Sequence, residues 1–172
     1  IYTLSLHDAL PISINIKLVD AIDNVSVNKE EAYRLTITPK AITVEAVAER
    51  GVYWAMQTLY QLKEEKGKKI RLQCATITDW PAFRIRGFMQ DVGRSYLSLE
   101  ELKREIAILS RFKINTFHWH LTENQAWRLE SKIFPMLNDS TNMTRMAGKY
   151  YTLEEARELT EFCKAHQVLL IP

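Results

Sequence analysis

The sequence predicts an α/β protein, in which part of a small α+β domain precedes part of a (β/α)8 TIM barrel, namely its first three strands and two helices. Two observations predict this class. Up to residue 80, strand-like and helix-like segments follow one another without clean alternation, which is typical of a small α+β unit. From residue 84 onward, near-continuous apolar strands are joined by amphipathic helices in the order β-α-β-α-β, which indicates a parallel sheet with right-handed crossovers.

The predicted α+β domain covers residues 13–80. Residues 33–38 and 41–47 alternate apolar and polar side chains around a proline-containing turn, so they predict a β-hairpin. Residues 51–65 then place apolar side chains at helical spacing, and residues 69–79 return to the strand pattern.

The predicted barrel part covers residues 84–172, after a boundary at residues 79–83 (DWPAF). Residues 84–92 and 114–122 are strand candidates, and residues 168–172 (VLLIP) begin a third strand. This third segment completes the β-α-β-α-β pattern.

Two capping boxes mark the helix starts in this part. Ser98 in SLEE and Thr152 in TLEE each precede a glutamate by three residues, so that hydroxyl and carboxylate satisfy free amides of a first turn. The first helix is expected to end near Lys113 and the second near His166. Both carry one apolar face.

Two architectures use this repeat, an open doubly wound sheet and a (β/α)8 barrel. The turn after residues 84–92 contains Gly-Arg-Ser-Tyr and no Gly-x-Gly-x-x-Gly, so it lacks a phosphate-binding signature and the barrel is preferred. Because a complete barrel needs about 250 residues, we expect a chain that is cut at both ends. Residues 1–12 resemble sequencing-adapter read-through and are expected to be non-native.

Composition excludes several functional classes. The 172 residues are 47% apolar and 26% charged, as in an ordinary globular protein, and the net charge of +2 gives no footprint for nucleic acid. No apolar window of about eighteen residues predicts a membrane span. Cys74 and Cys163 lie in segments of different type, so we expect two buried apolar residues and neither a disulfide framework nor a metal site.

The segment FHWHLTENQAWRLE contains two histidines with several interpretations. Alternation along a strand puts His118 and His120 on one face and Trp119 on the other. In a barrel the histidine face points to the axis, near the carboxyl-end mouth where active sites lie. The histidines are therefore metal ligands, interior hydrogen-bonding residues, or the wall of a ligand pocket. A closed metal site needs further ligands, for which Asp91 and Glu123 are the nearby strand-end carboxylates.

Arg94 follows the first barrel strand, at the mouth where a substrate would sit. Its guanidinium offers rigid paired donors for hydroxyl or carboxylate oxygens. The alternative is a surface salt bridge to Glu100 or Glu101. Trp127 either forms an apolar floor against a sugar ring or fills a loop core, and Glu123 is either a site carboxylate or part of a solvated loop.

Four motifs in this order, RGFMQDVGR, NTFHWHLTENQAWRLE, FP at 134–135 and YTLEEARELTEFCKAHQVLLIP, make the chain resemble glycoside hydrolase family 20, the β-N-acetylhexosaminidases. The likeness runs from about Arg84 to Pro172. The preceding segment resembles the small α+β domain that comes before the barrel in these enzymes. Several separated motifs in the right order are more specific than any one of them.

The resemblance implies that Arg94 holds hydroxyls of the terminal sugar in the innermost subsite. It also implies that His118 and His120 are barrel-interior residues of a metal-free sugar site, without a cofactor. Family members usually have Asp-Asp at Glu123-Asn124, and the first of these carboxylates orients a histidine that contacts the catalytic acid. Glu123 keeps this charge with one extra methylene, Asn124 loses it, and glycine stands at 93 where serine is common. The implied substrate-binding residues are Arg94 and Glu123, with Asp91, His120 and Trp127 as further candidates.

The implied chemistry is exo-acting, retaining and substrate-assisted hydrolysis of terminal non-reducing N-acetyl-β-D-hexosamine residues. In the family a glutamate protonates the leaving oxygen, and the aspartate before it stabilises the oxazolinium formed by the substrate's acetamido group. This Asp-Glu pair ends the fourth strand, and no Asp-Glu dipeptide occurs in the sequence. We therefore expect no catalytic residue here and no hydrolysis by this polypeptide alone.

The partners implied by the family are glycans that end in N-acetylglucosamine or N-acetylgalactosamine, and the implied location is periplasmic or secreted. Two alternatives stay open. One is a non-catalytic remnant that binds amino sugars, and the other is a metal-dependent barrel hydrolase that uses His118 and His120.

Overall fold

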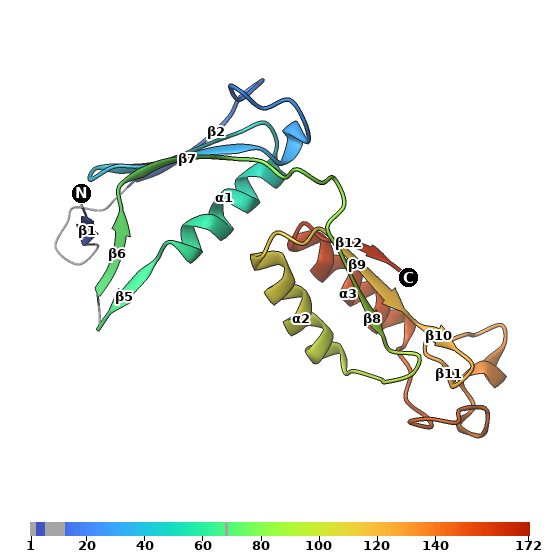
Figure 1. Cartoon of the computed structure of the whole chain (residues 1–172). Helices are drawn as coiled ribbons and strands as arrows, with labels where there is room; N and C mark the ends of the chain where they lie inside the picture. Colours follow the sequence, from blue (N-terminus) through green and yellow to red (C-terminus); the bar gives the residue numbers. More distant parts are fainter. Residues whose placement is uncertain (1–2, 6–12, 68) are drawn as a thin grey trace. The chain divides into compact units, whose positions relative to one another are not determined.

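The computed structural model describes residues 3–5, 13–67 and 69–172, which divide into two compact units, Ile1–Arg84 and Ile85–Pro172 (Figure 1). Of the segment 1–12, residues 1–2 and 6–12 lie outside the described residues. Each unit has a sheet and a hydrophobic core of its own. No helix among the described residues has the length and apolar character that a membrane crossing requires.

The first unit contains a four-stranded sheet with one helix on it. In spatial order its strands are β2 (Ser13–Leu18), β4 (Ala41–Ala46), β3 (Tyr33–Ile37) and β7 (Ala75–Asp79). Strands β3 and β4 pair antiparallel with Ile37 opposite Ile42, which confirms the predicted hairpin. Helix α1 (Glu49–Gln61) packs Trp54 and Leu59 against the buried side chains of this sheet.

Helix α1 lies very close to the backbone of Ala32 at Gly51. A Cβ atom there would lie 2.4 Å from the carbonyl oxygen of Ala32, so only glycine fits without a shift of the backbone. Beside the helix, the short 3-10 turn η1 (Lys29–Glu31) places Glu31 in the core, where its Oε2 accepts a 2.7 Å hydrogen bond from the indole of Trp54. This bond satisfies a buried donor and a buried acceptor together.

Two boundaries in this unit differ from the prediction. The helix predicted over residues 51–65 ends at Gln61, and β5 (Glu64–Lys66) pairs antiparallel with β6 (Lys69–Gln73), which also pairs with β1 (Thr3–Ser5). Gly67 at φ 65° lies between β5 and β6, and a left-handed glycine favours a turn over helix continuation. The strand predicted over residues 69–79 is likewise interrupted at Cys74, which is half-buried and not buried as expected.

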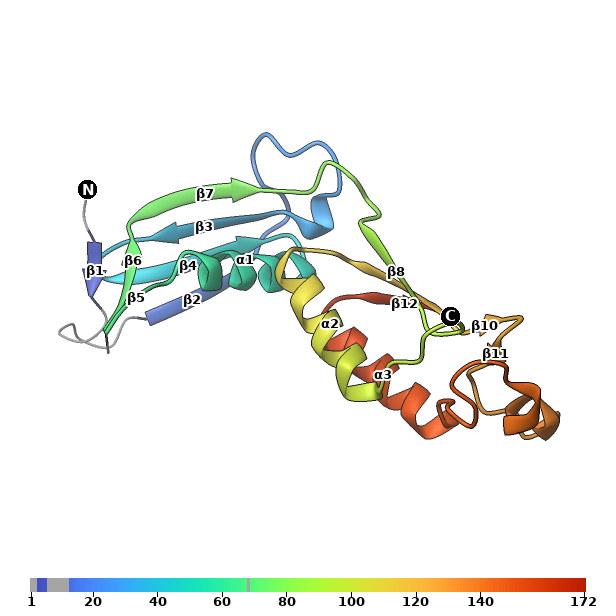
Figure 2. The same ribbon diagram turned by 60° about the horizontal axis from the view of Figure 1, so that its bottom comes forward.

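The second unit has the predicted β-α-β-α-β order. Its parallel sheet has the spatial order β12 (Leu169–Ile171), β9 (Thr116–His120) and β8 (Gly87–Asp91). Helix α2 (Leu99–Arg111) joins β8 to β9, and α3 (Leu153–Ala165) joins β9 to β12. Both helices lie on one side of this sheet and contact each other (Figure 2).

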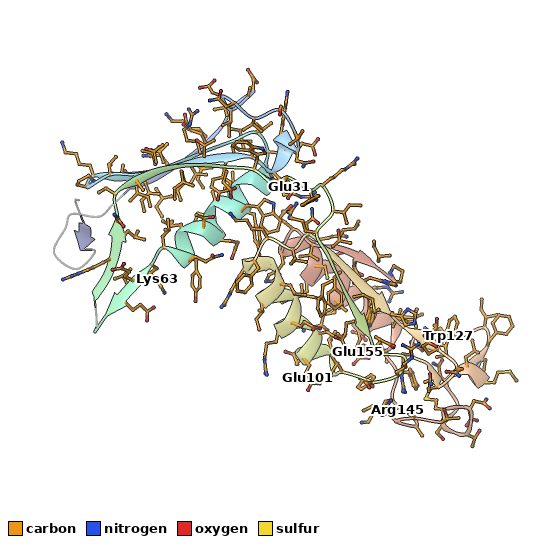
Figure 3. The ribbon with its side chains drawn as sticks, viewed as in Figure 1. Glu31, Lys63, Glu101, Trp127, Arg145 and Glu155 are labelled. Atoms are coloured by element: carbon orange, nitrogen blue, oxygen red, sulfur yellow. The ribbon has the colours of Figure 1, made fainter. Side chains whose placement is uncertain are left out.

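Both predicted capping boxes are present. The hydroxyl of Ser98 accepts a hydrogen bond from the amide of Glu101, and the carboxylate of Glu101 accepts one of 2.7 Å from the amide of Ser98. Thr152 and Glu155 repeat this arrangement at the start of α3. In Figure 3, Glu101 and Glu155 accordingly mark the amino ends of the two helices.

The alternation predicted along β9 is confirmed. Phe117 and Trp119 are 0% and 2% exposed and pack against α2 and α3, whereas His118 and His120 are half-buried on the opposite face. Cys163 of α3 is buried in the same core, as expected. The helix-covered face therefore forms the core, and the other face of the sheet carries the histidines together with the exposed apolar side chains of Met89, Leu169 and Ile171.

Candidate functional site

The site is built where the parallel strands β8 and β9 end side by side. The register places Asp91, the last residue of β8, opposite His120, the last residue of β9. The amides of Val92 and Gly93 then both donate hydrogen bonds to the carbonyl oxygen of His120, at 3.1 and 3.2 Å. These bonds fix the direction in which the chain leaves β8 and presents Arg94.

Arg94 connects the two strand ends through its guanidinium. Its Nη1 lies 2.8 Å from Oδ2 of Asp91, and its Nη2 lies 2.6 Å from Oε1 of Glu123, a residue 29 positions away in the sequence. The amide of Arg94 also donates to Oδ1 of Asp91 at 3.0 Å. The same Oε1 of Glu123 is 3.1 Å from Nε2 of His120. Four of the five predicted site residues thus form one hydrogen-bonded cluster.

Exposure separates the members of this cluster. The Arg94 side chain is 53% exposed, whereas those of Asp91 and Glu123 are 18% and 23% exposed. The less exposed carboxylates therefore contact the guanidinium on the protein side, and its other side faces solvent. The alternative salt bridge from Arg94 is not the one formed, because Glu100 pairs with Lys103 at 2.8 Å and Glu101 belongs to the capping box.

Gly93 lies against the side chain of Glu123. A Cβ atom at 93 would lie 3.1 Å from the Cβ and 3.2 Å from the Cγ of Glu123, closer than ordinary van der Waals contact. The absence of a side chain at 93 therefore allows the backbone and the first side-chain atoms of residue 123 to approach closely. The two departures from the usual family residues are in direct contact.

A cavity of about 230 Å³ adjoins the cluster on the histidine face of β9. This volume lies somewhat below the range for small-molecule sites, roughly 300 to 1,000 Å³. Trp127, in β11 (Ala126–Trp127), pairs across from Thr122 of β10 (Thr122–Glu123) and is 38% exposed. Its indole therefore lines the cavity and does not fill a loop core. The lining residues are His118, His120, Leu121, Thr122, Trp127, Leu129 and Pro172.

A metal ion at this site would use a different set of residues from the predicted histidine pair. Among the described residues, Asp91, His120 and Glu123 have ligand atoms within 4.8 Å of one another, and His118 is not in the group. The rings of His118 and His120 instead meet edge to face, with centroids 5.6 Å apart. Because the guanidinium of Arg94 already supplies a cation to both carboxylates, the geometry favours an ion-pair cluster over a metal centre.

One residue of this region was not predicted from the sequence. Arg128 is 0% exposed, although arginine is almost never fully buried without partners. Burial lowers its pKa, because the charged form loses solvation. The alternation of side chains along an extended segment could have predicted this burial. Trp127, at the preceding position, is exposed, so the side chain of Arg128 points inward.

Tyr151 is a second buried residue that was not predicted from the sequence. Its hydroxyl donates a 2.6 Å hydrogen bond to the carbonyl oxygen of Leu97, and burial raises its pKa. The ring stacks on Tyr96 at a centroid distance of 4.8 Å and meets Trp119 edge to face at 4.7 Å. The segment that follows Arg94 is thereby attached to the core of the second unit.

Comparison with known proteins gives matches along nearly the whole chain. The sequence profile of "Glycosyl hydrolase family 20, catalytic domain" matches residues 83–172. The profile of "Glycosyl hydrolase family 20, domain 2" matches residues 3–80, so it begins inside the segment 1–12 that we expected to be non-native.

Curated relatives include two bacterial β-hexosaminidases. That of Porphyromonas gingivalis is 37% identical over 164 residues, a match that covers 88% of this chain and 21% of the relative. That of Vibrio furnissii is 36% identical over 157 residues, covering 83% of this chain and 26% of the relative. The chain therefore spans about a fifth to a quarter of the length of these two relatives.

Solved structures agree with these matches. The exo-β-N-acetylglucosaminidase of Vibrio harveyi, solved with N-acetylglucosamine, superposes with a TM-score of 0.82 at 33% identity, covering 92% of this chain and 26% of that one. The β-N-acetylhexosaminidase of Bacteroides fragilis gives a TM-score of 0.83 at 27% identity, with 99% and 41% coverage. Because the catalytic-domain profile alone matches residues 83–172, more than half of the sequence, the chain belongs to glycosyl hydrolase family 20.

Proposed function

We propose that this chain is part of an exo-acting β-N-acetylhexosaminidase. The reaction is removal of terminal non-reducing N-acetyl-β-D-hexosamine residues by retaining, substrate-assisted hydrolysis. The observation that carries the proposal is the guanidinium of Arg94, held by two carboxylates at the ends of adjacent parallel strands and beside a cavity with an indole wall. The carboxyl ends of the strands are where (β/α)8 enzymes bind substrate.

In this proposal the chain supplies the hydroxyl-binding side of the innermost sugar subsite. Arg94 donates to hydroxyl oxygens of the terminal sugar through the donors that its carboxylate partners leave available. Asp91 and Glu123 keep the planar guanidinium in one orientation, which lowers the entropy lost on binding. Trp127 presents an apolar surface to the C–H face of the sugar ring, and His120 orients Glu123.

The bond-breaking step is assigned to residues outside these 172. The sequence contains no Asp-Glu dipeptide, so the acid that protonates the leaving oxygen is not assigned to any residue here. The substrates in this proposal are glycans that end in N-acetylglucosamine or N-acetylgalactosamine. The polypeptide alone is expected to bind the terminal sugar without cleaving it.

A chimeric enzyme tests this proposal. Residues 1–172 would replace the matching part of the Porphyromonas gingivalis relative, and hydrolysis of 4-nitrophenyl N-acetyl-β-D-glucosaminide and galactosaminide would be measured. We expect turnover that Arg94→Ala lowers by about 100-fold in kcat/KM, since a charged hydrogen-bond donor to substrate is lost. Arg157→Ala, at an exposed position of α3, is the matched control and should leave kcat/KM unchanged. A folded chimera without turnover, or one indifferent to Arg94→Ala, would contradict the proposal.

The missing Asp-Glu dipeptide also favours a second candidate, a chain that binds amino sugars without catalysis. Titration of the 172-residue chain with N-acetylglucosamine, followed by NMR, measures this binding directly. Binding lost in Arg94→Ala together with an inactive chimera would favour the second candidate, whereas an active chimera would favour the first.

A further inference from the structure

Arg128 uses its whole donor set on the backbone. A guanidinium has five N–H donors, and all five bond to backbone carbonyl oxygens in this structure. A sulfur contact from Nη1 to Sδ of Met143, at 3.6 Å, comes in addition. The carbonyl oxygens belong to Val92, Gly93, Arg145, Met146 and Lys149, at 2.6 to 3.2 Å.

These carbonyls come from two segments that are far apart in the sequence. Nε and Nη2 bond to Val92 and Gly93, the two residues that immediately precede Arg94. The other bonds reach a loop at residues 145–149, which we call the rim loop. One buried side chain therefore ties the backbone that carries Arg94 to the rim loop.

The rim loop needs such a tie because of its backbone. Met146 has φ 48° and Gly148 has φ 74°, so two of its residues adopt the left-handed conformation, which is unfavourable for methionine. The carbonyl oxygen of Met146 accepts a hydrogen bond from Arg128. The Sδ atom of Met146 accepts a hydrogen bond of 3.2 Å from the amide of Tyr96. The rim loop thus also touches the chain two residues after Arg94.

The arrangement requires an arginine and not merely a large side chain. A buried charge costs solvation energy, and an apolar side chain of the same volume would avoid that cost. Five convergent carbonyl oxygens, however, would each lose a donor around an apolar group, although that of Met146 would keep its hydrogen bond from the amide of Lys149. A lysine has three donors on one nitrogen and cannot span the same set of acceptors.

We propose that Arg128 is a positioning residue for Arg94. By fixing the carbonyls of Val92 and Gly93, it sets the exit of the chain from β8, and thus where the Arg94 guanidinium meets Asp91 and Glu123. Arg128 acts through the backbone and touches no substrate. The proposal rests on the proposed function for its effect on sugar binding, but its effect on the backbone is independent of that function.

The test compares Arg128→Lys with Arg157→Lys, a control at an exposed arginine of α3, in the 172-residue chain. Amide hydrogen exchange is measured by NMR at a temperature where both variants are fully folded. In Arg128→Lys we expect faster exchange at residues 92–94 and in the rim loop together, by about tenfold or more, with the β9–β12 ladder unchanged. Faster exchange in the rim loop alone would overturn the proposal, because Arg128 would then serve only that loop.

Sugar affinity and kinetics supply a readout that a merely structural role would not change. In the folded Arg128→Lys chain we expect N-acetylglucosamine to bind roughly ten- to a hundredfold more weakly, since Arg94 is misplaced. In the chimera KM should rise while kcat changes little. A purely structural role lowers the folded fraction and so lowers apparent kcat at unchanged KM, and that result would overturn the proposal.

A measurement on the wild-type chain covers the case in which Arg128→Lys does not fold. The amide of Gly93 bonds to His120 and the amide of Lys149 bonds to Met146. If Arg128 joins the segments, both amides exchange through one opening, with equal free energy and equal dependence on low urea concentrations. Unequal openings would overturn the proposal. A wild-type chain that binds no sugar but passes this exchange test would contradict only the proposed function.

Discussion

Arg94 and Arg128 lie at the same end of β8 and β9, and their environments are opposite. The Arg94 side chain is 53% exposed and is paired with two carboxylates, whereas Arg128 is fully buried and bonds only to carbonyl oxygens and one sulfur among the described residues. Among the described residues, the carboxylates engage two of the five donors of Arg94, and the carbonyls engage every donor of Arg128.

The contrast shows that burial and donor use decide what an arginine does. A half-exposed guanidinium with fixed orientation and remaining donors is suited to bind a polar ligand. A buried guanidinium with every donor occupied is suited to hold backbone segments together. Substitution of Arg94 should therefore mainly weaken ligand binding, and substitution of Arg128 should mainly lower the free energy of unfolding.

The largest expected effect is on stability and separates the two residues. Arg128→Met should lower the free energy of unfolding of the second unit by about 3 to 5 kcal/mol, because buried carbonyls lose their donors. Arg94→Met should lower it by about 0.5 kcal/mol or less, because its ion pairs are largely solvated. Urea unfolding followed by circular dichroism measures both. Equal losses for the two variants would remove the distinction.

The next effect concerns binding. Arg94→Lys should weaken N-acetylglucosamine binding by about tenfold, because a single ammonium cannot contact Asp91 and Glu123 in the planar geometry and still donate to the sugar. Isothermal titration calorimetry measures this change. The exposed control Arg157→Lys should bind as the wild type does, and unchanged affinity in Arg94→Lys would show that charge alone is sufficient.

A smaller effect is expected where Gly93 contacts Glu123. Gly93→Ser should disturb the Arg94 cluster, because the new Cβ lies only 3.1 Å from that of Glu123. Adding Glu123→Ala removes the Cγ that lies 3.2 Å from the new Cβ and should relieve part of the close contact, giving a coupling energy of about 0.5 to 1 kcal/mol in a double-mutant cycle. The thermal melts of the two single variants and the double variant provide the cycle. Additive effects would mean that the two positions are independent.

The smallest effect comes from Glu105 of α2, a half-buried ionisable group with one buried oxygen that, unlike Arg128, lacks hydrogen-bond partners among the described residues. Within the described residues, its Oε2 is buried without a hydrogen-bond partner, and desolvation raises its pKa. The folded state therefore binds a proton more tightly than the unfolded state, so this group makes stability fall as pH rises through its unfolded pKa toward its folded pKa.

Glu105→Gln should accordingly raise the melting temperature at pH 7 by about 1 to 2 °C, after allowance for solvent screening of a partly buried group. At a pH below both values of its pKa the substitution should have no such effect, because the wild-type carboxyl is then protonated in both states. A pH-independent increase would point to packing and not to charge.

Much of the second unit was predictable from the sequence, because its signals are local. The capping boxes at Ser98 and Thr152, the apolar faces of both helices and the alternation along β9 each depend on residues a few positions apart. The placement of Asp91, Arg94 and Glu123 near one mouth followed from the rule that parallel strands end at one edge of a sheet, whereas the ion pairs of Arg94 with Asp91 and Glu123 were not predicted.

The role of Arg128 was not predictable in the same way. Its acceptors are backbone carbonyls, which every residue possesses, so the side chains at 92–93 and 145–149 carry no signature of the contact. The region between Glu123 and Thr152 also lacks regular periodicity beyond short turns, so its path could not be derived. The end of α1 at Gln61 was also missed, because spacing alone did not reveal that residues 64–66 pair as a strand with β6.

Because Cys163 is buried, its rate of alkylation depends on how often the second unit opens. The thiolate is the form of cysteine that attacks alkylating reagents, and burial raises the pKa of this thiol to about 12, so the folded second unit offers almost no reactive sulfur. Cys74, half-buried in the first unit, is the other thiol of the chain. The mass increase at Cys163 over time, measured beside that at Cys74, would therefore report the opening of the second unit with the alkylating reagent as the probe.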